Sequence, residues 1–84
     1  MSIEMLMRMI KQELPDITKR GDTTIRAVAL FLDDTEWRVM AGGHYAVDLG
    51  EYNGDYSSQG ETAAQALERC LMLIRNDRLF RPTR

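Results

Sequence analysis

The sequence has very few of the residues that build reactive centres. Among its 84 residues there is one cysteine, Cys70, and one histidine, His44. A single cysteine excludes a disulfide within the chain, and Cys70 stands in an apolar helical pattern where a thiol usually acts as a small buried hydrophobe. A metal centre needs several converging ligands, which one imidazole does not supply. We therefore expect no catalytic residue, no metal site and no cofactor, and hence no enzyme.

Basic charge is also scarce. The only lysines are Lys11 and Lys19, the net charge is −2, and no lysine or arginine stands between Val39 and Glu68. Proteins that bind nucleic acid usually neutralise phosphates with a basic surplus or a strongly basic face. The charge distribution therefore argues against a nucleic-acid partner. It leaves one basic stretch, near the C-terminus, for an alternative nucleic-acid interface, whose candidate residues are Arg75, Arg78 and Arg81.

Long apolar runs are absent. No run approaches the roughly 18 apolar residues of a membrane-spanning helix, and Glu4 stands where a secretion signal would carry basic and then apolar residues. We expect a cytoplasmic protein without membrane contact. The length and the 44% hydrophobic content predict one domain, residues 1–84, with a disordered tail over 81–84. Because so small a core leaves little stability in reserve, we also expect a homodimer.

Two stretches show the periodicity of amphipathic helices. The first runs from Ser2 to about Leu14, and the second from Thr62 to about Arg75, directly after a turn at Gln59 to Glu61. Met5 and Met9 widen the apolar face of the first helix. Methionine side chains adapt to loose cores and to partner surfaces alike, so these two residues either pack in the core or line a partner groove.

The segment between these helices predicts antiparallel strands. A strand over residues 24–32 is apolar on both faces after Arg26, which favours a central or well-covered position. A turn at Asp33 to Thr35 leads to a second strand, from Glu36 or Trp37 to Met40.

The rest of the central segment leaves the strand number open. Residues 44–49 alternate again, either as a third strand or as a continuation past a bulge at Gly42 and Gly43. Residues 50–54 are expected to form a loop, and residues 55–58 a short strand. The order predicts an α+β fold: helix, three-stranded antiparallel sheet (two to four strands), helix. Both helices should cover one face of the sheet, because each has a single apolar stripe.

Aromatic residues gather in or near the predicted sheet. Aromatic side chains on a sheet stack nucleobases when basic residues accompany them, and this region lacks lysine and arginine. Tyrosine and tryptophan are also frequent in protein interfaces. They either contact a protein partner or belong to ordinary core and sheet-edge packing. With the two methionines, the candidate protein-contact residues are Trp37, Tyr45, Tyr52, Tyr56, Met5 and Met9.

A short stretch resembles known families. Residues 54–67 read GDYSSQGETAAQAL, which is similar to the strand-to-helix joint of HicB-like antitoxin domains. Together with Trp37 to Val39, this stretch also resembles small phage-encoded sandwich domains of unknown role. The order of elements resembles the double-stranded-RNA-binding fold. That family has a lysine cluster at the start of its second helix, where this chain has Ala63, Ala64 and Gln65.

The resemblance implies an α+β fold and a phage or prophage setting, and it assigns no residue roles. Together with the missing reactive centre, it leads us to expect a small non-catalytic accessory protein. We expect it to bind and modulate a protein partner, for example a host factor. The alternative is a nucleic-acid-binding protein of double-stranded-RNA-binding topology that uses the C-terminal arginines.

Overall fold

The described residues form two helices and six strands. The computed structural model describes residues 1–14, 23–24, 27–46 and 51–80, with the backbone alone described at 23–24, 44–46, 51–53 and 78–80. The elements follow in the order α1 (Ile3–Glu13), β1 (Thr23–Thr24), β2 (Val28–Leu32), β3 (Trp37–Ala41), β4 (His44–Ala46), β5 (Glu51–Asn53), β6 (Tyr56–Gly60) and α2 (Ala63–Phe80).

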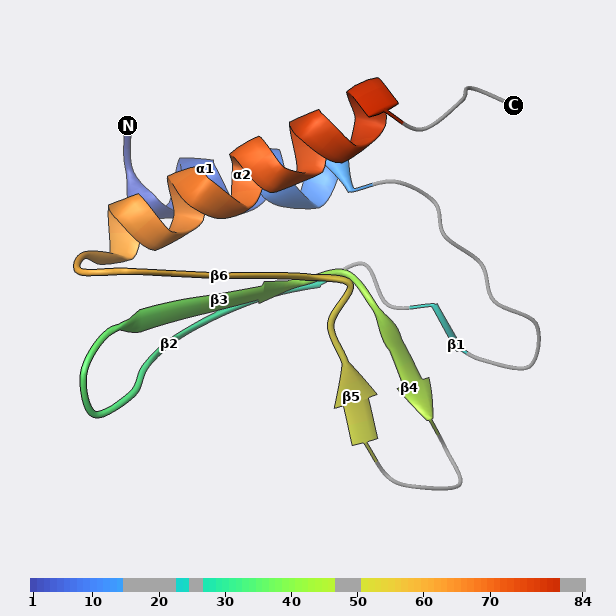
Figure 1. Ribbon diagram of the computed structural model, residues 1–84, viewed down its shortest axis with the longest axis horizontal. Helices are drawn as coiled ribbons and strands as arrows, with labels where there is room; N and C mark the ends of the chain where they lie inside the picture. The colour runs from blue at the N-terminus through green and yellow to red at the C-terminus, as the bar shows by residue number, and fades with distance from the viewer. Residues whose placement is uncertain (15–22, 25–26, 47–50, 81–84) are drawn as a thin grey trace.

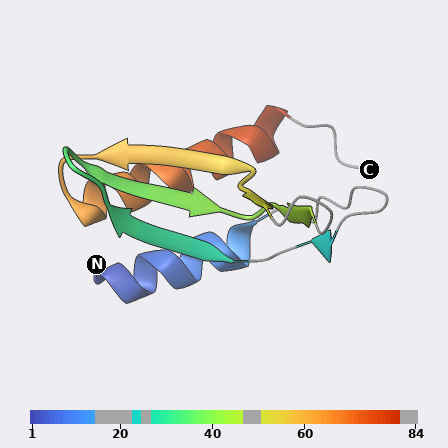
Figure 2. The same cartoon turned by 90° about the horizontal axis from the view of Figure 1, so that it is seen from below.

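Strands β2, β3 and β6 form the main sheet. It is antiparallel, with β3 in the centre and β2 and β6 at the edges. Leu30 pairs with Val39, and Val39 pairs with Ser58. Both helices lie on one face of this sheet, α2 nearest to β6 and α1 on the β2 side (Figures 1 and 2). The predicted α+β fold, with a three-stranded antiparallel sheet and two helices on one face, is confirmed.

Strands β1, β4 and β5 form a second, smaller antiparallel sheet. The β4–β5 hairpin extends away from the helices (Figure 1). Gly42 and Gly43, with φ of 69° and 118°, redirect the chain between β3 and β4, which explains the two glycines there. Two predictions were wrong. Residues 24–32 are not one strand, because β1 and β2 belong to different sheets, and residues 50–54, expected as a loop, contain β5.

Local sequence determines where α1 begins and ends. The hydroxyl of Ser2 accepts a hydrogen bond from the backbone N–H of Met5 at 3.1 Å, which makes Ser2 the N-cap. The helix ends at Glu13, and the N–H of Leu14 still donates to the carbonyl of Ile10 at 3.0 Å. The predicted first helix is therefore confirmed.

The start of α2 is held by a reciprocal cap. The Thr62 hydroxyl accepts from the N–H of Gln65 at 3.1 Å, and the Gln65 side chain accepts from the N–H of Glu61 at 2.8 Å. The spacing of Thr62 and Gln65 allows this pairing, which was not predicted. A Cβ at Gly60 would lie 2.8 Å from the backbone nitrogen of Ala66, so the strand-to-helix joint needs a glycine there.

The C-terminal end of α2 differs from its prediction. The helix continues to Phe80 rather than ending near Arg75. The hydroxyl of Tyr56 donates to the carboxylate of Asp77, and this bond ties the added turns of the helix to the sheet. The short polar stretch Asn76-Asp77 therefore does not interrupt the helix.

The hydrophobic core lies between the helices and the main sheet. Its members come from the periodic faces that the sequence predicts for the two helices, and from alternate residues of β3 and β6. The Ser58 hydroxyl donates to the carbonyl of Ala66 at 2.7 Å, which joins β6 to α2. The buried apolar residues are Leu6, Ile10, Leu14, Val39, Ala41, Tyr56, Ala66, Leu67, Cys70, Leu71 and Ile74.

Candidate functional site

The predicted aromatic residues do not gather on one surface. Trp37 and Tyr56 both lie on the helix-facing side of the main sheet, but at opposite ends of β3. Trp37 is half-buried against the core, and Tyr56 is only 8% exposed. Tyr45 and Tyr52 pair across β4 and β5, and their side chains lie outside the described part of the structure.

The two methionines of α1 have different surroundings. Met9 is half-buried and packs against the core, whereas Met5 is 55% exposed. Of the two alternatives for these residues, core packing therefore describes Met9, and only Met5 presents most of its side chain to a partner.

The first arginine of the C-terminal stretch already has an acidic partner. The Arg75 guanidinium donates two hydrogen bonds to the Glu13 carboxylate, at 2.9 and 2.8 Å, and so joins α2 to α1. This bidentate contact raises the pKa of Arg75. The side chain of Arg78 and all of Arg81 lie outside the described residues.

Cys70 is a core residue, as predicted. Its side chain is fully buried, and burial raises the pKa of the thiol to about 11, so the nucleophilic thiolate is rare at neutral pH. Within the described residues, no three His, Cys, Asp or Glu side chains lie close enough together to hold a metal ion. In the same part of the chain, neither helix has the length and apolar character needed to cross a membrane.

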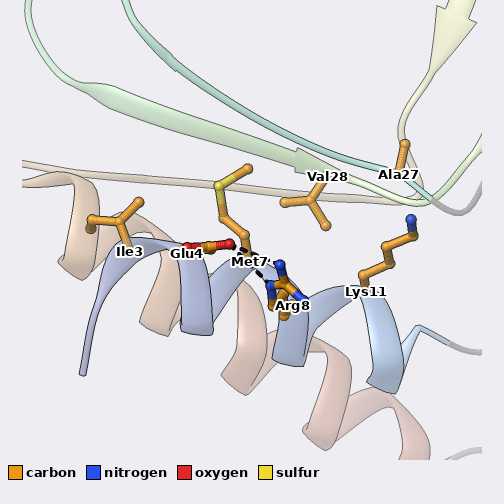
Figure 3. A pocket seen from close by; sticks show the side chains of 7 residues that line it. All are labelled: Ile3, Glu4, Met7, Arg8, Lys11, Ala27 and Val28. Atoms are coloured by element: carbon orange, nitrogen blue, oxygen red, sulfur yellow. Dashed lines mark hydrogen bonds and ion pairs between the residues drawn. The ribbon is translucent and has the colours of Figure 1, made fainter.

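A groove of about 600 Å³ opens between α1 and β2. Ile3 and Met7 line it from the helix, and Ala27 and Val28 line it from the strand side (Figure 3). α1 packs mainly on α2 and touches β2 only sparsely, which leaves this space open. The groove therefore has an apolar interior between a helix and the edge of a sheet.

Charged residues of α1 border the groove. The Arg8 guanidinium pairs with the Glu4 carboxylate at 2.9 Å, one helical turn apart and in the open (Figure 3). Lys11 lines the same groove as Ala27, one turn further along the helix. The rim thus carries charged side chains of α1, among them the ion pair of Glu4 and Arg8.

Alternate backbone N–H and C=O groups of β2 point away from β3, toward the side of β2 that has no neighbouring strand among the described residues. The carbonyl of Ala27 accepts from the N–H of Gly42 at 2.8 Å, and the N–H of Asp33 donates to the carbonyl of Glu36 at 3.0 Å, so both groups point toward β3. Successive residues of a strand point their backbone groups to opposite sides. The intervening residues that direct their N–H and C=O groups away from β3 are therefore Val28, Leu30 and Leu32.

This position corrects the prediction for β2. The sequence Val-Ala-Leu-Phe-Leu favours a central or well-covered strand, yet β2 pairs only with β3 among the described residues and forms an edge. Phe31 and Leu32 are 41% and 62% exposed. Exposed apolar edge strands attract further strands, and natural proteins usually protect them with charge, proline or a covering segment.

The opposite edge is built differently. β6 reads Tyr-Ser-Ser-Gln-Gly, and the Arg69 guanidinium donates to the outward carbonyl of Gln59 at 2.8 Å. A shallower groove of about 370 Å³ runs between β6 and α2. The apolar residues that line this groove are Met72 and Leu73, which are 62% and 45% exposed. This edge is polar and partly covered, in contrast to β2.

None of the residues that line the α1–β2 groove is among the contact residues predicted from the sequence. The groove joins segments that are more than ten positions apart in the chain, and its existence depends on where α1 packs. Only the apolar character of β2 on both faces pointed to it. No protein-family model, curated protein or solved structure matches the chain. The function is therefore inferred from the geometry of the molecule.

Proposed function

We propose that this protein is a small non-catalytic domain that acts by binding another protein at the α1–β2 groove. One observation carries the proposal: β2 is apolar on both faces, but among the described residues it lies at the edge of the main sheet and pairs only with β3. Apolar surface that is exposed to water raises the free energy of the protein. A partner that covers β2 removes this cost. The neighbouring apolar groove with a charged rim has the composition of a protein interface, which combines an apolar centre with a polar border.

The charge pairings support a protein partner over nucleic acid. Arg75 is held by Glu13, and Arg38, on the sheet face away from the helices, pairs with Asp33 and lies 3.5 Å from Glu36. Guanidinium groups that already have carboxylate partners gain less from phosphates than free ones do. From the sequence resemblance we retain the proposal of a phage or prophage protein that modulates a host factor.

Self-association is a separate proposal, and we assign it to α2. The residues Arg69, Met72, Leu73 and Asn76 border one groove and recur at the spacing of one helical face. In an antiparallel pair of α2 helices centred between Met72 and Leu73, Met72 of each copy would contact Leu73 of the other copy. It would also place Arg69 beside the Asn76 amide of the second copy. This surface is therefore complementary to itself under two-fold symmetry.

Capture from a bacterial lysate with matched variants tests the proposed surface. Ile3→Glu places a charge in the groove, and the helix dipole favours a glutamate in the first turn of α1, so the fold should be retained. Ser57→Glu places the same charge at an exposed position of β6, which does not line the α1–β2 groove. We expect proteins that the wild type and Ser57→Glu retain, and that Ile3→Glu loses by at least about tenfold, which corresponds to ~1.4 kcal/mol.

Circular dichroism and thermal unfolding confirm that both variants are folded before the comparison. Equal retention of the same proteins by Ile3→Glu and Ser57→Glu would contradict the groove as the docking surface. Retention of no protein by the wild type would contradict the binding function.

A further inference from the structure

We propose that the partner binds as an additional β-strand: an extended segment pairs with β2, and its alternate side chains enter the α1–β2 groove. This inference rests on the proposed function and specifies how the same surface recognises its partner. Strand addition of this kind derives affinity from main-chain hydrogen bonds and specificity from pockets for alternate side chains.

The backbone of β2 presents the required hydrogen-bonding groups. Val28, Leu30 and Leu32 direct their N–H and C=O groups away from β3, as the contacts of Ala27 and Asp33 show. The two other strands of the main sheet are antiparallel to their neighbours. An antiparallel segment would continue this pattern and would convert β2 into the central strand that its sequence favours.

The placement of α1 leaves room for a further strand. In Figure 2, α1 lies along the β2 side of the main sheet, while α2 lies behind β6. A fourth strand beside β2 would therefore extend over α1, a helix that now packs mainly on α2. The helix-facing side chains of the new strand would meet the apolar groove instead of solvent.

The groove determines the side chains that fit. Ile3, Met7 and Val28 offer an apolar interior within about 600 Å³, which suits branched aliphatic residues at alternate positions of the segment (Figure 3). On the opposite face of the sheet, the neighbours are Ala29 and the exposed Phe31. A segment with apolar residues on both faces therefore matches β2 best.

The antiparallel pattern of the main sheet determines the direction of the segment. An added strand that is antiparallel to β2 would run from Leu32 toward Val28, at the start of β2. The C-terminal end of an antiparallel segment would lie at this point. The partner is therefore an extended peptide segment with alternating aliphatic residues that runs antiparallel to β2.

Substitutions of Leu32 can distinguish the contribution of its backbone N–H to binding from the contribution of its side chain. Leu32→Ala and Leu32→Pro both remove the leucine side chain, which is 62% exposed. Only proline removes the outward N–H, and an edge strand tolerates proline at such a position. We expect both variants to remain folded by circular dichroism, and only Leu32→Pro to lack one hydrogen bond to an added strand.

The probe is a library of random octapeptides displayed on phage and selected against the wild-type protein. We expect the enriched peptides to carry aliphatic residues at alternate positions. A synthetic copy of the most enriched peptide, measured by fluorescence anisotropy, should bind Leu32→Pro roughly five- to tenfold more weakly than Leu32→Ala.

Three results would overturn strand addition. These are the absence of enriched peptides, enrichment of peptides with helical spacing of apolar residues, or equal affinity for Leu32→Pro and Leu32→Ala. If Ile3→Glu still weakens lysate capture in any of these cases, the proposed function is supported and only binding by strand addition is contradicted. If Ile3→Glu does not weaken capture, the α1–β2 groove is contradicted as the docking surface.

A second copy of this chain is the other possible occupant of β2. Sedimentation velocity of the free protein distinguishes it from a partner segment. A dimer that dissociates in Leu32→Pro but persists in Leu32→Ala would place the second copy on β2 and overturn the proposal. We expect instead that Leu32→Pro and Leu32→Ala sediment alike.

Discussion

At the scale of single residues, Asp33 organises the turn between β2 and β3. One oxygen of its carboxylate accepts the backbone N–H groups of Thr35 and Glu36, at 3.0 and 2.9 Å, and the carboxylate also pairs with Arg38. These hydrogen bonds stabilise the charged form and lower the pKa of Asp33 from 3.8 to about 2. The turn that fixes the end of β2 therefore depends on an ionised carboxylate.

Acid should weaken the fold through this residue. Because the pKa of Asp33 is lower in the folded than in the unfolded state, its stabilising effect is complete above about pH 4 and is lost as the pH falls through about 2. We expect the urea midpoint of Asp33→Asn to fall less steeply over this interval than that of the wild type. Asp34→Asn, in the same turn, should follow the wild type. Equal slopes for the wild type and Asp33→Asn would contradict this account.

At the same scale, the sequence predicted buried residues better than contact residues. The helical spacing around Cys70 correctly predicted a buried thiol, because periodicity reports which side of a helix faces the core. Residue type alone did not separate core from surface among the candidate contact residues. Tyr56 is buried, whereas Met5 is exposed. Tyrosine serves both environments, so its position in the fold decides which one applies.

At the scale of elements, local signals predicted the helices well. The N-cap Ser2 and the apolar stripes placed α1 and the start of α2 correctly. The strands were harder, because pairing depends on distant segments. The same apolar pattern is compatible with a central strand and with an edge strand that a binding partner covers. The sequence therefore predicted the nature of β2 but not its position in the sheet.

The position and size of the α1–β2 groove could not be predicted from the sequence. Its size depends on how far α1 lies from β2, and that distance follows from the packing of α1 on α2. Packing between two amphipathic helices has several solutions of similar energy, and the hydrophobic pattern does not select one of them. Ile3 and Met7 continue the apolar stripe of α1, and nothing in their spacing indicates that they border an open space.

At the scale of the whole molecule, the two edges of the main sheet predict two separate contacts. We expect the free protein to dimerise through α2, independently of the β2 edge. Met72→Glu should shift the sedimentation coefficient to that of a monomer at concentrations where the wild type is dimeric, because each of the two added carboxylates would be buried against the apolar Leu73 of the second copy. Leu32→Ala, which alters an equally exposed residue (62%) on the other edge, should leave the dimer intact. A wild type that stays monomeric at all accessible concentrations would contradict the α2 contact.

The most direct test of the central claim is amide hydrogen exchange at the β2 edge, with and without the captured partner. In the free protein, the N–H groups of Val28, Leu30 and Leu32 should exchange rapidly, because they point away from β3. The bound partner should slow their exchange by at least about tenfold and leave the N–H groups of Ser57 and Gln59, on the β6 edge, unchanged. Unchanged exchange at β2 in the complex, or protection confined to β6, would contradict the account.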